Sequence, residues 1–502
     1  MTANLTISEL QESYKTGIIT PEEVIEAIIE LAAMDKEKNI WITPPTMANV
    51  YPYLDNLKRM DRETTPLWGI PFAVKDNIDV AGLPTTAGCY EYVYVPSEHA
   101  TVVQRLIEAG AIPIGKTNLD QFATGLVGTR SPYGETYNGV RADLISGGSS
   151  SGSAVSVVRN QAAFALGTDT AGFGRVPAAL NGLVGFKPSL GAWSTKGVVP
   201  ACESLDCVTV FSHTVEDALI VDGIVRGEDP NNPWSKVIED PKPELPEKIL
   251  IPEEEPEFYG DFAKEYKEAW KKSIKRLQQL DIPIEYVNTE LLSEAANILY
   301  GGPWVAERWA ALGEFLENNP GKVFPVTEEV LRSGSGANYD ASSVFSAMHY
   351  LQEIKQEVKK WLKNAVLAMP TCGGTWTREQ VRKNPIQTNN DMGRYTNHCN
   401  LLDMSAIAVP GEEAGVSLPF GITFFGLANQ EGLTVGAGLA YSDARNKTTP
   451  IVVCGLHMRG FPLEKQMHEH GAVFVKEAKT AAKYKLYKLP TIPEKPGLIK
   501  QV

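Results

Sequence analysis

The sequence predicts an α/β protein in which helices cover both faces of a β-sheet. Short apolar runs, typical of buried strands, alternate along the chain with longer segments in which apolar residues recur at helical spacing. Glycine-containing turns separate the two kinds of segment. This alternation is typical of a sheet that is sandwiched between two layers of helices.

The chain begins with two predicted helices. Residues 7–14 place apolar side chains at helical spacing. The segment ITPEEVIEAIIELAA then starts a second helix, for which Thr20 is the N-cap and Pro21 the first helical residue. Glu23 stands three residues after Thr20 and completes a capping box.

Three further segments predict the beginning of the sheet. Residues 70–74 form a short buried strand that ends in a polar loop. Residues 99–118 combine a helix, a glycine stop and a short strand, which together make an αβ unit. Residues 153–172 repeat this order, with AFALG as the strand and a glycine-containing turn after it.

The second half of the chain begins with a connector. Residues 228–257 are rich in Pro, Asp and Glu, and the segment KILIP within them is a candidate strand. An amphipathic helix follows over residues 262–280, and helical patterns continue through 290–318 and 343–365. Strand patterns return at 365–371, 405–411 and 419–426.

A change of composition after Thr449 marks the predicted domain boundary. We expect one large domain over residues 1–450, since that length suffices for a large α/β core. Residues 451–502 are then a separate small appendage, which is too short to hold a core of its own.

The charge of the chain argues against two classes of partner. With 47 basic and 61 acidic residues, the net charge is −14, and no long basic stripe is present to bind nucleic acid. No apolar run approaches the ~18–20 residues that span a bilayer, and the N-terminus lacks the pattern of a secretory signal. We therefore expect a cytoplasmic protein that binds neither membranes nor nucleic acid.

Cysteine and histidine spacing predicts no metal site. The six cysteines are scattered and form no CxxC pair, and the seven histidines show no metal-ligand spacing. Reduced thiols are the expected state of these cysteines.

Three stretches carry residues suited to catalysis. They are AVKDNIDV (73–80), ISGGSSSGSAV (145–155) and GTDTAGFGRVPAALNG (167–182). Taken singly, Lys75 beside Asp76 is typical of a surface ion pair, and a Gly/Ser run is typical of a flexible linker. The Gly/Ser run, however, lies between α/β elements and not between domains.

Together, the three stretches indicate a hydroxyl-relay site. The glycines allow the backbone to approach a ligand closely, and the following helix start offers free N–H groups. A desolvated Lys75 has a lowered pKa and can act as a base through a serine hydroxyl. Such a base activates a second hydroxyl for acyl transfer. That second hydroxyl is missing from the third stretch.

These motifs resemble the amidase signature family. Lys75 in AVKDNID matches the family lysine, and the run from Gly147 to Ser150 matches the Gly-Gly-Ser-Ser loop. The resemblance implies a mixed sheet sandwiched by helices over residues 5–445, with Ser149 as the bridging serine on a cis peptide bond. It places the nucleophile 24 residues later, where this chain has Phe173.

Phe173 has no nucleophilic atom, and its ring is expected to crowd the space where a carbonyl must sit. The surrounding turn matches the family, so the resemblance still implies an oxyanion hole there. Its donors are expected among Thr170, Ala171, Gly172 and the N–H of Phe173.

Four longer segments resemble the allophanate hydrolases within this family. In that group a tyrosine and an arginine hold the substrate carboxylate, which implies that role for Tyr300 and Arg308. A guanidinium suits it, because it binds a carboxylate through two parallel hydrogen bonds. Residues after 451 resemble the start of the group's C-terminal domain, cut short. The four segments are 119–134, 169–188, 194–211 and 300–309.

The resemblance implies an amidohydrolase that releases ammonia from allophanate during urea degradation and needs no metal or organic cofactor. With Phe173 at the nucleophile position, we expect the chain to be inactive or severely impaired. One alternative is a non-catalytic homologue that binds a small carboxylated ligand or a partner. Another is an amidase of the same fold that acts on a different amide. The expected partner is a small carboxylated amide or urea substrate. The sequence does not decide between a monomer and a homodimer.

Overall fold

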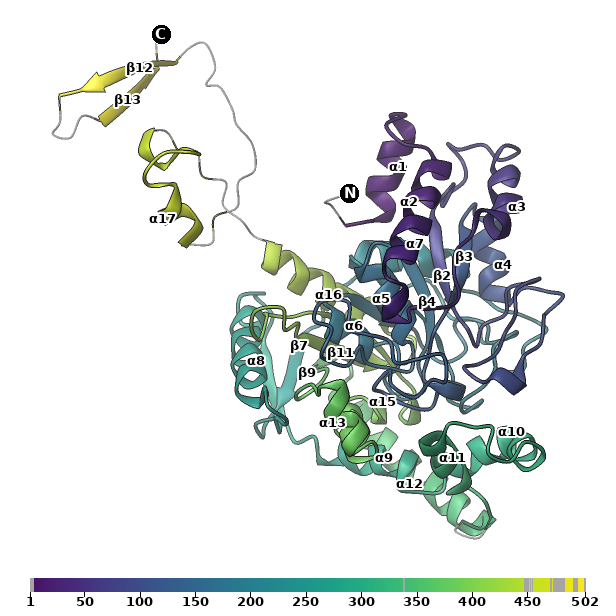
Figure 1. The fold of residues 1–502 in the computed structure, drawn as a ribbon. Helices are drawn as coiled ribbons and strands as arrows, with labels where there is room; N and C mark the ends of the chain where they lie inside the picture. Colours follow the sequence, from purple (N-terminus) through teal and green to yellow (C-terminus); the bar gives the residue numbers. More distant parts are fainter. Residues whose placement is uncertain are drawn as a thin grey trace. The chain divides into compact units, whose positions relative to one another are not determined.

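The computed structural model divides into two compact units, residues 1–445 and 446–502 (Figure 1). Nearly all of the first unit is described, over residues 4–336 and 339–445. In the second unit the described residues are 446, 451, 453, 455–469, 472, 484–490 and 495–500.

The first unit is built on an eleven-stranded mixed sheet with the order β1-β3-β2-β4-β6-β5-β10-β11-β9-β7-β8. Its two flanks contain parallel pairs, β2 with β3 and β4, and β7 with β8 and β9. The strands between them pair antiparallel. The strands are β1 (Trp41–Thr43), β2 (Pro71–Lys75), β3 (Ile112–Thr117), β4 (Phe164–Thr168), β5 (Val184–Lys187), β6 (Val208–Ser212), β7 (Lys248–Pro252), β8 (Ile284–Val287), β9 (Ala365–Pro370), β10 (Met404–Pro410) and β11 (Gly421–Leu427).

Helices flank this sheet, as Figure 1 shows. The α-helices of the first unit are α1 (Ile7–Lys15), α2 (Pro21–Met34), α3 (Met47–Leu57), α4 (Thr101–Glu108), α5 (Ser151–Val158), α6 (Val176–Asn181), α7 (Val215–Val225), α8 (Ala263–Leu277), α9 (Glu290–Tyr300), α10 (Val305–Asn318), α11 (Pro325–Arg332), α12 (Ala341–Trp361), α13 (Arg378–Lys383), α14 (Gln387–Gly393), α15 (His398–Leu401) and α16 (Glu431–Asn446). The predicted α/β class, a mixed sheet covered by helices, is confirmed.

Both faces of the sheet are buried, each in its own apolar core. Along β10, Ala406 belongs to one cluster of buried side chains and Ile407 to the other. Along β11, Phe424 and Phe425 divide between the two clusters in the same way. Successive side chains of a strand point to opposite faces, so this alternation places one core above the sheet and one below it.

Most local predictions agree with the structure. The capping box of Thr20 and Glu23 is present at the start of α2, and the expected strand at 70–74 is β2. The helical pattern over 290–318 is two helices, α9 and α10, because Gly301, Gly302 and Pro303 interrupt it.

The sheet brings two catalytic stretches to one place. Strands β2 and β4 pair in parallel, so their carboxyl ends lie at the same edge. Lys75 is the last residue of β2, and Thr168 is the last residue of β4. The Gly/Ser run leads directly into α5, which packs against both strands.

The described part of the second unit contains α17 (Glu464–Glu469) and an antiparallel hairpin of β12 (Tyr484–Leu489) and β13 (Lys495–Lys500). Across the residues that the structure describes in both units, no helix has the length and apolarity required to cross a membrane.

Candidate active site

The expected contact between Lys75 and Ser149 is present. The two residues are 74 positions apart in sequence, and Nζ of Lys75 lies 2.7 Å from Oγ of Ser149. Nζ lies equally close, at 2.7 Å, to Oγ1 of Thr168. Lys75 and Ser149 are both fully buried. This geometry allows a proton to pass between Ser149 and Lys75.

Lys75 has the protonation behaviour that a base needs. Burial lowers the pKa of Lys75 from 10.5 to about 7, while the charges of Asp120, Asp206 and Asp169 oppose this shift. A large fraction of the amine is therefore neutral near pH 7, and a neutral amine can accept a proton.

The Gly/Ser run is a buried loop and not a flexible linker. The Gly148–Ser149 peptide bond is cis, as expected. A Cβ at Gly148 would lie 2.0 Å from Oδ2 of Asp120, so this position accepts no side chain without a shift of the loop. Ser150 fixes the loop to β4, because its hydroxyl donates to the carbonyl of Thr168 at 3.2 Å.

A buried ion pair shapes the turn after β4. Arg175 donates to both carboxylate oxygens of Asp169, at 2.8 and 3.0 Å, and the N–H groups of Gly172 and Gly174 donate to the same carboxylate. Burial alone raises the pKa of Asp169, but Arg175 and these hydrogen bonds hold it below its usual value. The carboxylate therefore stays ionised and holds the turn closed.

The turn presents three free backbone donors. Within the described part of the chain, the N–H groups of Thr170, Ala171 and Phe173 have no hydrogen-bond acceptor. All three residues are fully buried. The N–H of Gly172 is already donated to Asp169 at 2.6 Å, so the set of free donors is smaller than the sequence suggested. Buried N–H groups without partners are rare and are suited to a ligand oxygen.

Phe173 fills the space beside the relay. Its ring is fully buried, and its centroid lies 5.9 Å from Nζ of Lys75. Phe173 belongs to the same apolar cluster as Ala171 and Val176. The residue therefore faces Lys75 without offering a group that could attack.

Tyr300 and Arg308 lie together at the end of α9 and on α10. Arg308 is fully buried, and Nη2 donates to Oη of Tyr300 at 3.2 Å. Nη1 donates to the hydroxyl of Thr124 at 3.0 Å, and Nε has no hydrogen-bond partner among the residues that the structure describes. No carboxylate of the described residues lies within 4.0 Å of this guanidinium. A buried cation without an acidic partner is suited to an anionic ligand.

Helix α10 is tied to the turn after β4 through Asp206. The neighbour of Arg308, Glu307, accepts from the N–H and the hydroxyl of Ser204. Two residues after Ser204 in the sequence, the carboxylate of Asp206 accepts from the hydroxyl of Thr170 at 2.5 Å. Burial raises the pKa of Asp206 to about 6. One hydrogen-bonded loop therefore connects the helix that carries Arg308 with the free donors.

The sequence did not identify several of these contacts. Thr168, Asp206 and Thr124 each lie in a segment that was noted, but no local pattern showed their partners. The ion pair of Asp169 and Arg175 had a signal, because opposite charges six residues apart flank a glycine-rich turn.

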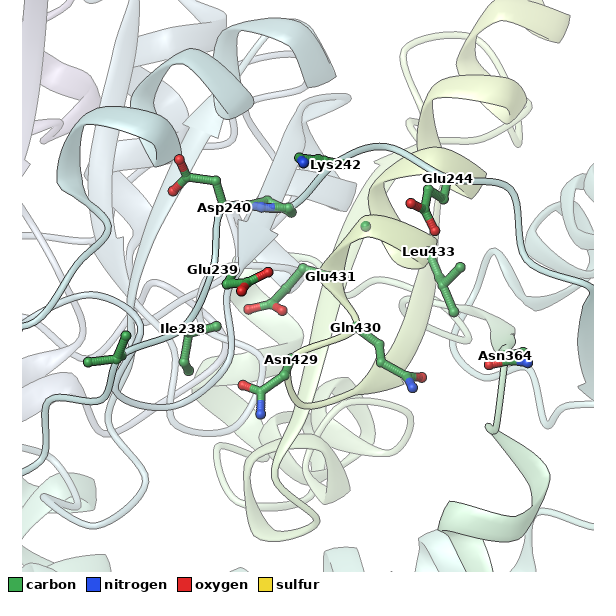
Figure 2. Close-up of a pocket in the computed structure, with 13 residues that line it drawn as sticks. Ile238, Glu239, Asp240, Lys242, Glu244, Asn364, Asn429, Gln430, Glu431 and Leu433 are labelled. Atoms are coloured by element: carbon green, nitrogen blue, oxygen red, sulfur yellow. The ribbon is translucent and has the colours of Figure 1, made fainter.

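A separate surface hollow contains none of the expected site residues (Figure 2). It has a volume of about 500 Å³ and is lined by residues 237–242, 244, 364 and 429–433. Figure 2 shows the carboxylate of Glu431 among these residues. Glu431 already accepts from the N–H of Ser189 and from Arg226, so its role there is structural.

Comparison with known proteins identifies the family. The family model described as Amidase matches residues 23–435. The chain belongs to the amidase family. A second model, the allophanate hydrolase C-terminal domain, matches residues 449–502.

Relatives agree with this assignment. Urea amidolyase of Saccharomyces cerevisiae is 38% identical over 515 residues, which cover 95% of this chain and 28% of that protein. The chain thus spans less than a third of this relative. The allophanate hydrolase structure of Kluyveromyces lactis is 37% identical with a TM-score of 0.82, covering 99% of this chain and 87% of that one. The urea amidolyase structure of the same yeast gives the same identity and TM-score, with 32% of that chain covered.

Proposed function

We propose that this amidase-family chain carries the site of an allophanate hydrolase, in which Arg308 and Tyr300 hold the carboxylate of a small amide. The observation that carries this proposal is the buried guanidinium of Arg308, which has no acidic partner in the described part of the chain. A substrate carboxylate would supply the missing charge through two parallel hydrogen bonds. The similarity to one allophanate hydrolase structure and one urea amidolyase structure supports the same substrate class.

The relay would serve acyl transfer in a chain with serine at position 173. The serine oxygen would bond to the amide carbonyl carbon while its proton passes through Ser149 to Lys75. The free N–H groups of Thr170, Ala171 and residue 173 would bind the oxyanion. The proton would then pass to the leaving amine, which departs as ammonia, and water would release the acyl group and restore the serine.

In the chain as it stands, Phe173 replaces the attacking hydroxyl. Removal of a nucleophile in a hydroxyl-relay enzyme lowers kcat by about 10⁶. The ring also occupies volume beside Lys75. We therefore propose that hydrolysis is absent or severely impaired.

Phe173 favours a second candidate function. A chain that keeps the carboxylate-binding pair but lacks the nucleophile could bind a small carboxylated ligand without turnover. Measured binding of such a ligand, with no ammonia released, would support this alternative.

Selectivity for the carboxylate tests the proposed function. In a Phe173→Ser chain, Arg308→Ala should lower kcat/KM for allophanate. The loss should correspond to about 2–5 kcal/mol in activation free energy, because a charge-assisted contact in a buried site is lost. Hydrolysis of an uncharged amide should change little. Arg59→Ala is the matched control, since Arg59 is 78% exposed and lies outside the site.

Equal loss on both substrates would contradict carboxylate recognition. The general amidase alternative would then explain the site better.

A further inference from the structure

The hydroxyl of Thr124 contacts the guanidinium that is proposed to bind the substrate. It accepts a hydrogen bond from Nη1 of Arg308 at 3.0 Å, across 184 positions of sequence. The same hydroxyl donates to the carbonyl of Phe122 at 3.1 Å. Both the acceptor and the donor function of the hydroxyl are therefore used, and its orientation is fixed.

The segment around Thr124 is held in place from two sides. Asp120 accepts from the N–H groups of Val127, Gly128 and Arg130 and so folds the segment around one carboxylate. The guanidinium of Arg130 donates to the carbonyl of Thr124 at 3.2 Å. Thr124 is 1% exposed.

This segment is also joined to the relay. The N–H of Asp120 donates to the carbonyl of Ser149 at 3.1 Å. Thr124 therefore has a defined position relative to Ser149. Because its hydroxyl binds Arg308, the guanidinium also has a defined position relative to Ser149. Such a connection holds the guanidinium of Arg308 in one place, where it could bind a carboxylate.

The neutral character of this contact leaves the charge of Arg308 available. An aspartate in place of Thr124 would neutralise the guanidinium and compete with a substrate carboxylate. The hydroxyls of Thr124 and Tyr300 hold Nη1 and Nη2 without doing so, while buried Nε stays unpartnered. The two hydroxyls thus orient the guanidinium of Arg308, while its positive charge stays available for a ligand.

We propose that Thr124 is a positioning residue that determines selectivity for carboxylated amides by fixing the plane of Arg308. This inference rests on the proposed function, because it assumes that Arg308 binds the substrate carboxylate. Loss of the hydroxyl would let the guanidinium rotate, and the parallel pair of hydrogen bonds to a carboxylate would be weakened.

The test uses Thr124→Val and Thr124→Ser in a Phe173→Ser chain. Thr124→Val should raise KM for allophanate about tenfold to a hundredfold, because a hydrogen bond to a charged group is lost. Its kcat, and both constants for an uncharged amide, should change little. Thr124→Ser keeps the hydroxyl and should restore the original KM.

Thr327→Val is the matched control for a buried threonine. Thr327 is fully buried on α11, and among the described residues its hydroxyl has no hydrogen-bond partner. This variant should leave KM for both substrates unchanged. A KM that is unchanged in Thr124→Val, or that rises equally for both substrates, would overturn the positioning role.

A binding measurement keeps the test independent of turnover. In a Phe173→Ala chain, calorimetry compares malonamate, in which a methylene replaces the central NH of allophanate, with uncharged malonamide. Thr124→Val should weaken malonamate alone, and equal affinity for malonamate with and without the hydroxyl would refute the inference. Arg308→Ala separates the two proposals. If this variant binds malonamate as tightly as its parent, the proposed function fails. If Arg308→Ala weakens malonamate binding but Thr124→Val does not, only the positioning role fails.

Discussion

Replacement of Arg175 by methionine should strongly destabilise the first unit. Arg175 and Asp169 have fully buried side chains, and Arg175 supplies two of the four hydrogen bonds to the carboxylate. Arg175→Met leaves two backbone N–H groups facing a buried, uncompensated charge. Breaking a buried pair in this way costs about 3–5 kcal/mol in the free energy of unfolding.

Arg141→Met provides the matched control at the surface. Arg141 also donates through Nε and Nη2 to the two oxygens of one carboxylate, that of Asp143, at 2.9 and 3.1 Å. These side chains are 35% and 52% exposed, so the loss should stay below about 1 kcal/mol. Urea unfolding followed by tryptophan fluorescence measures both variants.

The pH dependence of Arg175→Met gives a second readout. In the unchanged chain the pKa of Asp169 is lowered, so its contribution to stability is present above the unfolded pKa and is lost as pH falls through the folded pKa. Without Arg175, burial dominates and raises that pKa, so protonation favours the folded variant. The difference between the two chains should shrink toward acid pH. Equal losses in Arg175→Met and Arg141→Met, or a pH-independent difference, would refute the reasoning.

Two further predictions concern the relay loop and its base. In a Phe173→Ser chain, kcat/KM should fall as pH drops below about 7, because Lys75 must be neutral to accept a proton and its pKa is about 7; a flat profile between pH 5 and pH 9 would argue against Lys75 as the base. Gly148→Ala should lower both the unfolding midpoint and activity, because the added Cβ would lie 2.0 Å from Asp120 and 2.8 Å from the N atom of Gly128. Gly223→Ala is its control, since a Cβ there meets no atom of the described residues within 4 Å, and equal stability of the two variants would contradict the close approach.

Local physics made much of the fold predictable from the sequence. The capping box at Thr20 and the apolar run of β2 depend on neighbouring residues only, and both agree with the structure. The interruption between α9 and α10 was missed, although Gly301 and Pro303 stand there in the sequence. A periodic pattern continued across it and concealed the break.

The site depended on contacts that local patterns do not contain. Lys75 and Ser149 were placed together through the family resemblance. Their contact follows from the packing of α5, which begins two residues after Ser149, against β2 and β4. Thr124 and Arg308 come from segments 184 positions apart, so no spacing rule connects them. Their meeting depends on how α10 packs, which only the folded chain shows.

Ammonia release from allophanate by the unchanged chain, Phe173→Ala and Phe173→Ser tests the central claim most directly. Both replacements remove the ring beside Lys75, but only one adds a hydroxyl at the position that faces the relay. Phe173→Ser should release ammonia faster than the other two chains by several orders of magnitude, up to about 10⁶ in kcat. An unchanged chain that turns over at a comparable rate, or a Phe173→Ser chain no faster than Phe173→Ala, would contradict the account.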